Sequence, residues 1–525
     1  MKKQFRFCCA AAALVLTAAA MPPLTASADF SQDSSRTPYE VPDFSVIGAA
    51  GSLSAEETRN ICEAVYHSVQ SHQKQVPLAN FGIDLTDQNA VEVIDLYRTV
   101  ISSWDAGILV INGQVTYNTY HDTIQINYRF PDSEYHTQYN AYIEKLDAIL
   151  AGVNPQWSDV EKALYLHDYI AVHYDYDFAA YYGKITRSDR EQYSAFGMLK
   201  NGCAVCEGYS ELYAILLHRL GIDAAVVTSD QLGHAWNILR IGGSWYHTDV
   251  TWDDSSVHYA GLTDHINFLR TAGQMRESGH DADDWVTSWH TDVTGLAVPD
   301  TFSHAFWLET DAAILPQGGG WISVCGSEPC QLIRNTGIAA DGTASQTVLC
   351  TLDESQAKWL VFDKPGYVWR NPYVVPAVIG DTVFYTTPYA VYALCGEQAV
   401  PVRTLTDAEQ SKGFIYGLYA QGDTLYFGID TKRRSAEETL EQGVPYYAIE
   451  AAQWQAALPA ADLPYDLNED RTVSAADAVA LARCIAETHP ADSFRFDKAD
   501  LDADGILSLS DLNLLLTVLQ QPDTH

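Results

Sequence analysis

A cysteine, a histidine and an aspartate stand in this order within one stretch of the chain, residues 201–254, in contexts that suit nucleophilic catalysis. They are Cys206, His234 and Asp249. A thiol attacks as the thiolate, so it needs a base that accepts its proton and a third group that fixes the tautomer of the base. The residue types therefore predict a nucleophile (Cys206), its general base (His234) and an orienting carboxylate (Asp249).

The residues after Cys206 predict a helix that begins at or near this cysteine. Apolar side chains recur there at helical spacing, and Gly221 gives a stop signal. The repeating positions are Tyr209, Leu212, Tyr213, Leu216, Leu217 and Leu220. The unpaired amides and positive dipole end of a helix N-terminus favour a thiolate. We therefore expect the helix to activate the sulfur of Cys206.

Two apolar segments, 235–241 and 245–252, are separated by Gly242 and Gly243, which predict a tight hairpin turn. In a two-residue turn Ile241 faces Ser244, which by counting places Trp236 opposite Asp249 and His234 opposite Thr251. His234 and Asp249 would then be diagonal neighbours on one face of the ribbon. A three-residue loop would reverse this parity, so the expected contact depends on the turn.

Cys203 and Cys206 form a CxxC pair, a spacing that also suits a redox dithiol or half of a zinc site. The sequence offers no second CxxC or paired-histidine motif to complete a zinc site. A redox role would leave His234 and Asp249 without a function. We therefore predict that Cys206 is the nucleophile and Cys203 a passive neighbour, with a disulfide between them as a possible off-switch.

The segments VCEGY, GHAWN and DVTWDD resemble the three motifs of the transglutaminase-like cysteine enzymes, a branch of the papain-like thiol fold. The resemblance extends upstream through EKALYLHDYIAVHYDYD and covers roughly residues 54–295. It implies that Cys206, His234 and Asp249 form the triad of an enzyme that makes a thioester from an amide. Transfer to water would make a peptidase or amidase, and transfer to a lysine-type amine a cross-linking transglutaminase. A groove that binds peptide or glycan without catalysis is the remaining alternative.

The C-terminal region contains two candidate calcium loops, 34 residues apart. In each loop, oxygen-bearing side chains occupy positions 1, 3, 5, 9 and 12, and the residue at position 7 offers its backbone carbonyl. The first loop has Asp466, Asn468, Asp470, Thr472, Ser474 and Asp477, and the second has Asp500, Asp502, Asp504, Ile506, Ser508 and Asp511. An apolar helix is expected after each loop, and two Ca²⁺ ions are predicted.

This duplicated loop and helix, with aspartate at position 12, resembles the type I dockerin modules of cellulosomal proteins. The resemblance implies a cohesin module of a scaffolding protein as partner, contacted by residues 475–476 and 509–510. Arg471 replaces the glycine preferred at position 6 of the first loop, whereas Gly505 is present in the second. The first site is therefore expected to bind calcium more weakly.

The N-terminus predicts export. Basic residues precede an apolar run over 7–20 and a small-residue cleavage site at 26–28, as in a secretory signal peptide (1–28). The net charge of −37 argues against nucleic-acid or anionic-membrane partners. No later run of about 18 apolar residues predicts a membrane span. We expect a secreted, extracellular protein, associated with a cell-surface cellulosome.

The expected fold is a multidomain α+β protein. Residues 29–53 predict a flexible leader, 54–150 an accessory α+β region, 151–297 the transglutaminase-like (papain-like) core, 298–458 a β-rich module and 462–522 an all-α, calcium-binding dockerin. GDTVFYTT at Gly380 recurs as GDTLYFGI at Gly422, with GGWISVC near Gly319 as a weaker relative, so we expect repeated hairpins in a sandwich or meander.

Three other residues, all upstream of Cys206, carry side chains that can take part in chemistry. The spacing of His167 and His173 matches no metal motif, so both are expected to be structural. Tyr176 belongs to an aromatic cluster that could line the substrate groove and could support an oxyanion beside the Cys206 amide. The combined expectation is a cysteine-dependent acyl-transfer enzyme without a catalytic cofactor, acting on protein or peptide amides, with hydrolysis favoured over transamidation.

Overall fold

The computed structural model describes residues 42–111, 113, 115–254, 260–289, 291–296, 298–325, 329–353, 356–360, 373–395, 398–431 and 446–458, and in the C-terminal region 465, 467, 475–486, 499–502 and 506–519. The predicted signal peptide lies outside these residues. The expected flexible leader is wrong for residues 42–53. Phe44 and Ile47 of the short helix η1 (Phe44–Ile47) are buried, and the Phe44 ring lies 5.0 Å from that of Trp104. Apolar side chains thus anchor this segment to the accessory region.

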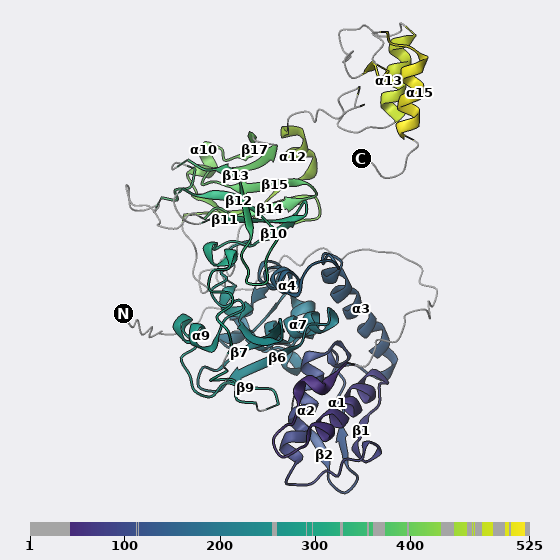
Figure 1. The fold of residues 1–525 in the computed structure, drawn as a ribbon, viewed down its shortest axis with the longest axis vertical. Helices are drawn as coiled ribbons and strands as arrows, with labels where there is room; N and C mark the ends of the chain where they lie inside the picture. Colours follow the sequence, from purple (N-terminus) through teal and green to yellow (C-terminus); the bar gives the residue numbers. More distant parts are fainter. Residues whose placement is uncertain are drawn as a thin grey trace.

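The accessory region is an α+β layer, as predicted (Figure 1). Its elements are α1 (Ala55–Gln70), β1 (Gln75–Pro77), η2 (Leu78–Phe81), α2 (Ala90–Ser103), η3 (Asp105–Gly107), β2 (Thr116–Asn118), β3 (Thr123–Gln125) and α3 (Asp132–Leu150). Ser54 and Glu57 form a capping box at the start of α1. The strands β2 and β3 are short and begin at Thr116 and Thr123.

The central region is built around an antiparallel sheet of order β8-β7-β6-β9. Its elements are α4 (Asp159–His173), β4 (Asp175–Tyr176), α5 (Phe178–Tyr181), η4 (Ser188–Tyr193), α6 (Ala195–Asn201), β5 (Cys203–Ala204), α7 (Cys206–Arg219), β6 (Ala224–Ser229), β7 (His234–Ile241), β8 (Ser244–Thr248), α8 (Val250–Asp253), α9 (Ala272–Ser278) and β9 (Val286–Thr287).

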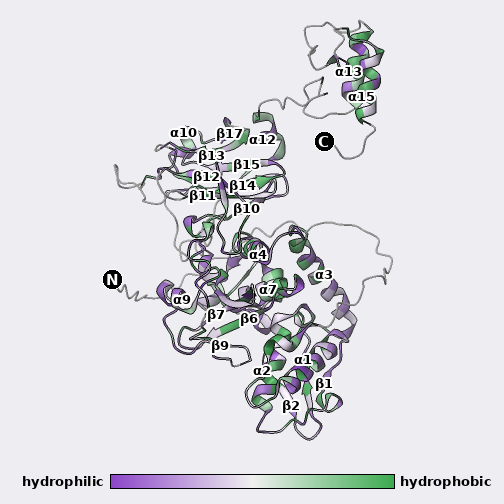
Figure 2. Cartoon of the chain, viewed as in Figure 1, coloured by the Kyte–Doolittle hydropathy of each residue, from purple (hydrophilic) through white to green (hydrophobic). Residues whose placement is uncertain are grey.

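The sheet separates two hydrophobic cores. Ala224 and Val226 of β6 belong to the core around α4 and α7, whereas Ala225 and Val227 belong to the core around α1 and α2. Side chains alternate between the faces of a strand, so a strand covered on both faces must be apolar throughout. Figure 2 shows β6 in the hydrophobic colour. The accessory region thus forms the second layer that the central sheet requires.

The β-rich module consists of three antiparallel sheets in sequential strand order, β10-β11-β12-β13, β14-β15-β16-β17 and β18-β19-β20. The elements are η5 (Phe306–Glu309), β10 (Leu315–Gln317), β11 (Gly320–Cys325), β12 (Gln331–Thr336), β13 (Ser345–Thr351), β14 (Pro376–Ile379), β15 (Thr382–Thr386), β16 (Ala390–Cys395), β17 (Gln398–Thr404), α10 (Asp407–Gln410), β18 (Phe414–Gln421), β19 (Thr424–Asp430), β20 (Tyr446–Ile449) and α12 (Ala451–Ala457).

The repeated sequence phrases are the first hairpin turns of these three sheets. Ile379 pairs with Thr382 across a two-residue turn, Gln421 pairs with Thr424, and Gln317 pairs with Gly320. The first residue of each turn is a glycine with positive φ: Gly318, Gly380 and Gly422. Two-residue hairpin turns favour glycine for this reason. The predicted meander of repeated hairpins is confirmed.

The boundary between the core and the β-rich module does not fall at residue 298. Phe302, Trp307 and Trp321 are buried in the same core as α7. From the other direction, Leu262 is buried in the core of the β-rich sheets, and Ala260 accepts a hydrogen bond from the backbone amide of Leu418. The two regions are interleaved rather than joined by a simple linker.

The C-terminal region contains the helices α13 (Ala475–Ile485) and α15 (Leu509–Leu519). They share a small core of their own, which includes Leu467, Leu481 and Leu515. The apolar helices expected after each loop are therefore present. Within the described part of the chain, no helix combines the length and apolar composition that a membrane crossing would need.

The start of α7 is packed tightly at Gly208. A Cβ added there would lie 2.4 Å from Cβ of Ala204 and 3.1 Å from the backbone oxygen of Ser194. We predict that Gly208→Ala lowers the free energy of unfolding by about 1–3 kcal/mol through overpacking. The double variant Ala204→Gly/Gly208→Ala should recover part of this loss, measured by urea unfolding as a double-mutant cycle. Additive effects of the two changes would contradict the close packing.

Candidate active site

Cys206 is the first residue of α7, as its sequence context predicts. Val205 precedes it as the N-cap, and the thiol is buried. Polar partners from the other two motifs hold α7 in place. The Tyr209 hydroxyl donates to a carboxylate oxygen of Asp254 over 2.6 Å, and the Asn237 side-chain amide donates to the backbone oxygen of Ser210 over 3.0 Å. The three sequence motifs therefore interlock around the start of one helix.

The hairpin has the predicted two-residue turn. Ile241 pairs with Ser244, and Gly242 and Gly243 adopt φ values of 59° and 87°. The register continues to Asn237 opposite Thr248 and stops there. The expected pairs of Trp236 with Asp249 and of His234 with Thr251 are therefore wrong. The chain turns into α8 at this point instead, and the Asp249 side chain caps α8 by accepting from the Trp252 amide over 3.1 Å.

His234 and Asp249 nevertheless meet, as their predicted diagonal placement requires. Nε2 of His234 lies 2.7 Å from Oδ2 of Asp249, and both residues are buried. Because Nε2 donates to the carboxylate, Nδ1 is the ring nitrogen left to accept a proton from the thiol of Cys206. Asp249 thus selects the tautomer that can act as a base.

The electrostatics of the pair favour its charged form. Burial opposes protonation of His234, but the charge and hydrogen bond of Asp249, together with the hydrogen bond and charge of Cys206, raise the pKa of His234 to about 10. Burial also opposes ionisation of Asp249. The charge of His234 and the hydrogen bonds from His234 and His280 hold the pKa of Asp249 well below its usual range. The site therefore stabilises an imidazolium beside the sulfur.

Sequence reasoning missed His280. Its Nε2 lies 2.8 Å from the same Oδ2 of Asp249, and its side chain is fully buried. It follows α9, 31 residues beyond Asp249, in the segment ESGHDADDW, which matches no motif. Only the folded path of the chain after α8 brings this histidine to the carboxylate, so no local pattern could have revealed it.

Aromatic side chains border the site. The Trp252 ring stacks on that of His234 at 4.9 Å and 22°, and Trp252 is 39% exposed. Burial, followed by the charge of Cys206, raises the pKa of Tyr176 well above its usual value, so this phenol is within electrostatic range of the sulfur. Tyr181 and Tyr182 are exposed next in sequence. The aromatic cluster is thus close to the thiol, while the oxyanion role of Tyr176 stays a prediction.

Cys203 has surroundings different from those of Cys206. It lies on β5, paired with Asp175 of β4, and the Arg187 guanidinium donates to its sulfur over 3.2 Å. Burial and the nearby Asp177 carboxylate raise the pKa of Cys203 to about 12, against the opposing charge of Arg187. Both Cys203 and Cys206 are free thiols. A protonated Cys203 agrees with its expected role as a passive neighbour.

The second calcium loop brings its described carboxylates together. Oxygens of Asp500, Asp502 and Asp511 lie within 4.8 Å of one another. Asp511 also accepts from the backbone amides of Leu501 and Ser508, over 2.7 and 2.8 Å. Such an oxygen set fits a hard cation such as Ca²⁺. Ile506 and Ser508, the remaining described positions, lie on the same loop.

One hydrogen bond of the second loop has a described counterpart in the first loop. Asp477 accepts from the amide of Leu467 over 2.8 Å, as Asp511 does from Leu501. Position 12 therefore closes both loops in the same way. The other predicted ligands lie outside the described residues: Asp466, Asn468, Asp470, Thr472, Ser474 and Asp504.

The raised pKa of His234 gives a testable pH dependence of stability. Since its folded pKa (about 10) lies above the unfolded value of about 6.5, this group stabilises the fold fully below pH ~6.5 and ceases to do so as pH rises through 10. The unfolding free energy of wild type minus that of His234→Gln should fall between these values, by at most about 1.4 kcal/mol per pH unit. Urea unfolding at several pH values measures this difference, and parallel curves would contradict the assignment.

Comparisons with known proteins agree with these observations for two regions. No curated protein matches the chain. A solved structure described as "Crystal structure of a TGase" shares 21% identity at a TM-score of 0.20, over 23% of this chain and 34% of that one. The chain thus matches about a third of that structure. The family model of the transglutaminase-like superfamily matches residues 147–250, and that of the dockerin type I domain matches residues 464–519. The chain therefore contains a transglutaminase-like domain and a type I dockerin domain.

Proposed function

We propose that this protein is a secreted, cellulosome-associated, cysteine-dependent acyl-transfer enzyme that acts on protein or peptide amide bonds. The observation that carries the proposal is the buried His234–Asp249 pair, 2.7 Å apart, beside a thiol at the first position of α7. Thiol catalysis needs a nucleophile, a base that takes its proton and a third group that orients the base.

The proposed reaction has two halves, and His234 moves the proton in both. Nδ1 of His234 takes the thiol proton, and the Cys206 thiolate attacks the amide carbonyl carbon. The Cys206 amide, at a helix start where amides lack intrahelical acceptors, donates to the oxyanion. His234 returns the proton to the nitrogen as the C–N bond breaks, which leaves a thioester. Water or an amine then attacks the thioester carbonyl carbon while His234 takes its proton. The C–S bond breaks, which releases the acid or the new amide, and His234 returns the proton to the Cys206 sulfur.

Several features favour a peptide substrate and hydrolysis. Trp252, which stacks on His234, exposes aromatic surface, and so do Tyr182 and Tyr181, whose ring lies 5.8 Å from that of Tyr176. Such side chains supply contact area for peptide groups. The triad itself serves water and amine acceptors equally. A secreted enzyme attached to a scaffolding protein is suited to the degradation of polypeptides. A peptidase or amidase is therefore favoured over a cross-linking transglutaminase. A non-catalytic peptide or glycan binder would have no use for a buried charged His234–Asp249 pair, which is costly to maintain.

The dockerin is the part of the chain that would bind the scaffolding protein. A dockerin implies a cohesin, and the described helices expose apolar side chains suited to such an interface: Val479 on α13 and Leu509, Leu514 and Leu516 on α15. Leu509, which the resemblance places at the cohesin surface, is 67% exposed. We propose that two calcium ions order the loops that present these helices.

The catalytic proposal predicts that product formation depends on Cys206. A glutamine-containing peptide is incubated with the full chain and a fluorescent amine, and mass spectrometry follows cleaved or deamidated peptide and the amine adduct. Cys206→Ser should lower turnover by at least about 10³-fold, and Asp249→Asn by about 10²–10⁴-fold because His234 loses its tautomer. Cleaved or deamidated product in excess over adduct is expected.

Cys203→Ser is the matched control, since this thiol lies three residues away and is held by Arg187. It should retain activity within about twofold. Turnover that survives Cys206→Ser, or that is lost equally in both cysteine variants, would contradict the assignment of the nucleophile. Binding of the peptide without any Cys206-dependent product would favour the non-catalytic alternative.

The dockerin proposal predicts separable effects on calcium and cohesin. Asp502→Ala removes a carboxylate from the second loop and should weaken calcium binding at that site by about tenfold or more in calorimetry of the full chain. Leu509→Asp should abolish calcium-dependent capture by a type I cohesin and leave calcium binding unchanged. Asp381→Ala, in a hairpin turn of the β-rich module, is the control for charge removal. Cohesin capture that persists after loss of both calcium sites would refute the assignment.

A further inference from the structure

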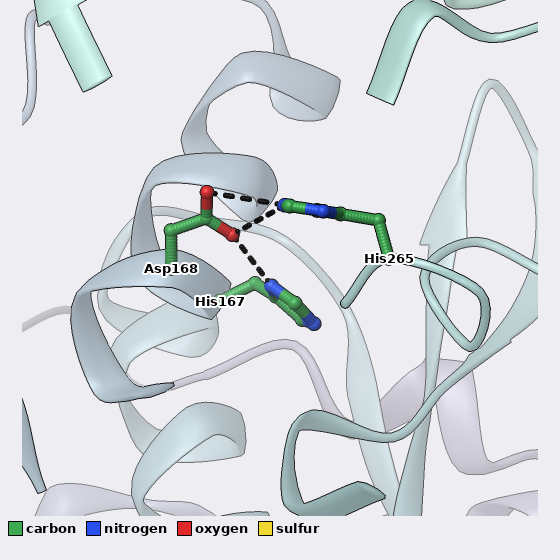
Figure 3. Close-up of side chains that lie close together, drawn as sticks. All are labelled: His167, Asp168 and His265. Carbon is green, nitrogen blue, oxygen red and sulfur yellow. Dashed lines mark hydrogen bonds and ion pairs between the residues drawn. The ribbon is translucent and has the colours of Figure 1, made fainter. Parts of the chain in front are cut away.

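A second group of buried histidines and carboxylates lies on the other side of α8, away from Asp249. Figure 3 shows His167 and Asp168 on α4 and His265 from the segment after α8, with their polar atoms turned toward one another. Their side chains are 0–3% exposed. Nδ1 of His167 is 2.7 Å from Oδ1 of Asp168, and Nε2 of His265 is 3.0 Å from the same oxygen.

The outward-facing nitrogens of both rings also have acceptors. Nε2 of His167 lies 3.2 Å from a carboxylate oxygen of Asp253, and Nδ1 of His265 lies 3.4 Å from the backbone oxygen of Thr310. A neutral imidazole donates from one nitrogen only. With both carboxylates ionised and protons alone in the site, these four contacts therefore require both rings to be imidazolium ions.

One divalent cation between His167, Asp168 and His265 satisfies the same atoms. Both rings are then neutral, and each donates its outer N–H to Asp253 or to Thr310. The total charge is zero in both cases, because two protons or one divalent cation offset the carboxylates of Asp168 and Asp253. A ligand histidine whose second nitrogen donates to a carboxylate or backbone carbonyl is the usual arrangement around protein-bound metals. Two such histidines in one cluster favour the cation.

We propose that His167, Asp168 and His265 bind one structural zinc-type divalent cation, oriented by Asp253 and the Thr310 carbonyl. Two imidazoles and a carboxylate suit Zn²⁺ among the common cations, since calcium and magnesium prefer oxygen alone. His167 keeps the structural role expected from its sequence, but as a ligand. The spacing rule missed it because the partner histidine lies 98 residues away (265 − 167).

The distances between the ligand atoms allow this with small movements. The ligand atoms of the three residues lie within 4.8 Å of one another. Bonds of about 2.0 Å to a tetrahedral zinc separate ligand atoms by about 3.3 Å. The hydrogen-bond distances of 2.7 and 3.0 Å would therefore lengthen by about 0.6 and about 0.3 Å. A cavity of about 260 Å³, lined by Asp168, Tyr169 and Ile314 among others, offers an approach to the carboxylate.

Such a cation would join three parts of the fold. It would connect α4 of the core, the segment that follows α8, and through Thr310 and Ile314 the start of the β-rich module, where the Ile314 amide donates to Asp168 over 2.6 Å. The inference does not rest on the proposed acyl-transfer activity, because metal content and stability report on it directly.

The test measures zinc in the full chain. Protein produced with zinc is dialysed against excess calcium and a mild chelator, so that the dockerin loops hold calcium, and metals are counted by mass spectrometry. One zinc per chain is expected in wild type, with at least a tenfold loss in Asp168→Asn and His265→Gln. His173→Gln, on the same helix, is the matched control. His280→Gln alters the other histidine–carboxylate group, His234, Asp249 and His280, whose atoms are also close enough to hold a cation. This variant should keep its zinc.

Two measurements keep the proposal falsifiable if the ligand variants do not fold. Wild type refolded from guanidinium with zinc should melt at a higher temperature than wild type refolded with chelator. X-ray absorption should show nitrogen and oxygen ligands, including imidazole, and no sulfur, which excludes Cys203 and Cys206 as ligands. Wild type without zinc under these conditions, or zinc that is lost in His280→Gln, would overturn the proposal and leave a pair of imidazolium ions in the cluster.

Discussion

The site depends on one buried carboxylate, that of Asp249. It is fully buried and accepts hydrogen bonds from three donors that come from different parts of the chain: His234 on β7, the Trp252 amide in α8, and His280 beyond α9. A buried charge that lost one of these partners would destabilise the protein by several kcal/mol. The hairpin turn, the α8 turn and the segment after α9 must therefore all be formed for the buried Asp249 carboxylate to stay ionised, which links the partner of His234 to the integrity of the fold.

The short helix α8 extends this constraint to its neighbours. Asp249 caps its start, Asp253 at its end lies against His167, and Asp254 accepts from the Tyr209 hydroxyl of α7. Three carboxylates within six residues would repel one another if they shared one environment. Each instead faces a different donor group, on β7, α4 and α7. A helix of only four residues has few backbone hydrogen bonds, such as that from the Asp254 amide to the Val250 oxygen, so it also depends on these side-chain contacts. In return it fixes the spacing between the thiol helix and the histidine strand.

The parts that sequence could predict are those whose cause is local. The start of α7 at Cys206, the turn at Gly242 and Gly243 and the Gly-Asp hairpins each follow from backbone preferences within a few residues. The parts that were missed depend on distant chain segments. His280 and His265 acquire their roles from the path that the chain takes after α8. The strand expected to pair His234 with Thr251 ends early, because the Asp249 side chain instead caps α8 and accepts from the Trp252 amide.

Contacts between distant chain segments also tie the β-rich module to the region around α8. After α8 the described chain resumes at Ala260, which contacts this module. Ala260 accepts from Leu418 of β18, and the Ala313 amide donates to Gly261. At φ 94°, Gly261 lies so close to the Leu418 carbonyl that an added Cβ would be 2.4 Å from it, so this crossing admits only glycine. Before the crossing, Asp253 contacts His167 of α4, and after it Leu262 belongs to the β-rich core. The module is therefore a structural part of the transglutaminase-like unit, because its removal would release the chain that orders α8 and the Asp249 carboxylate.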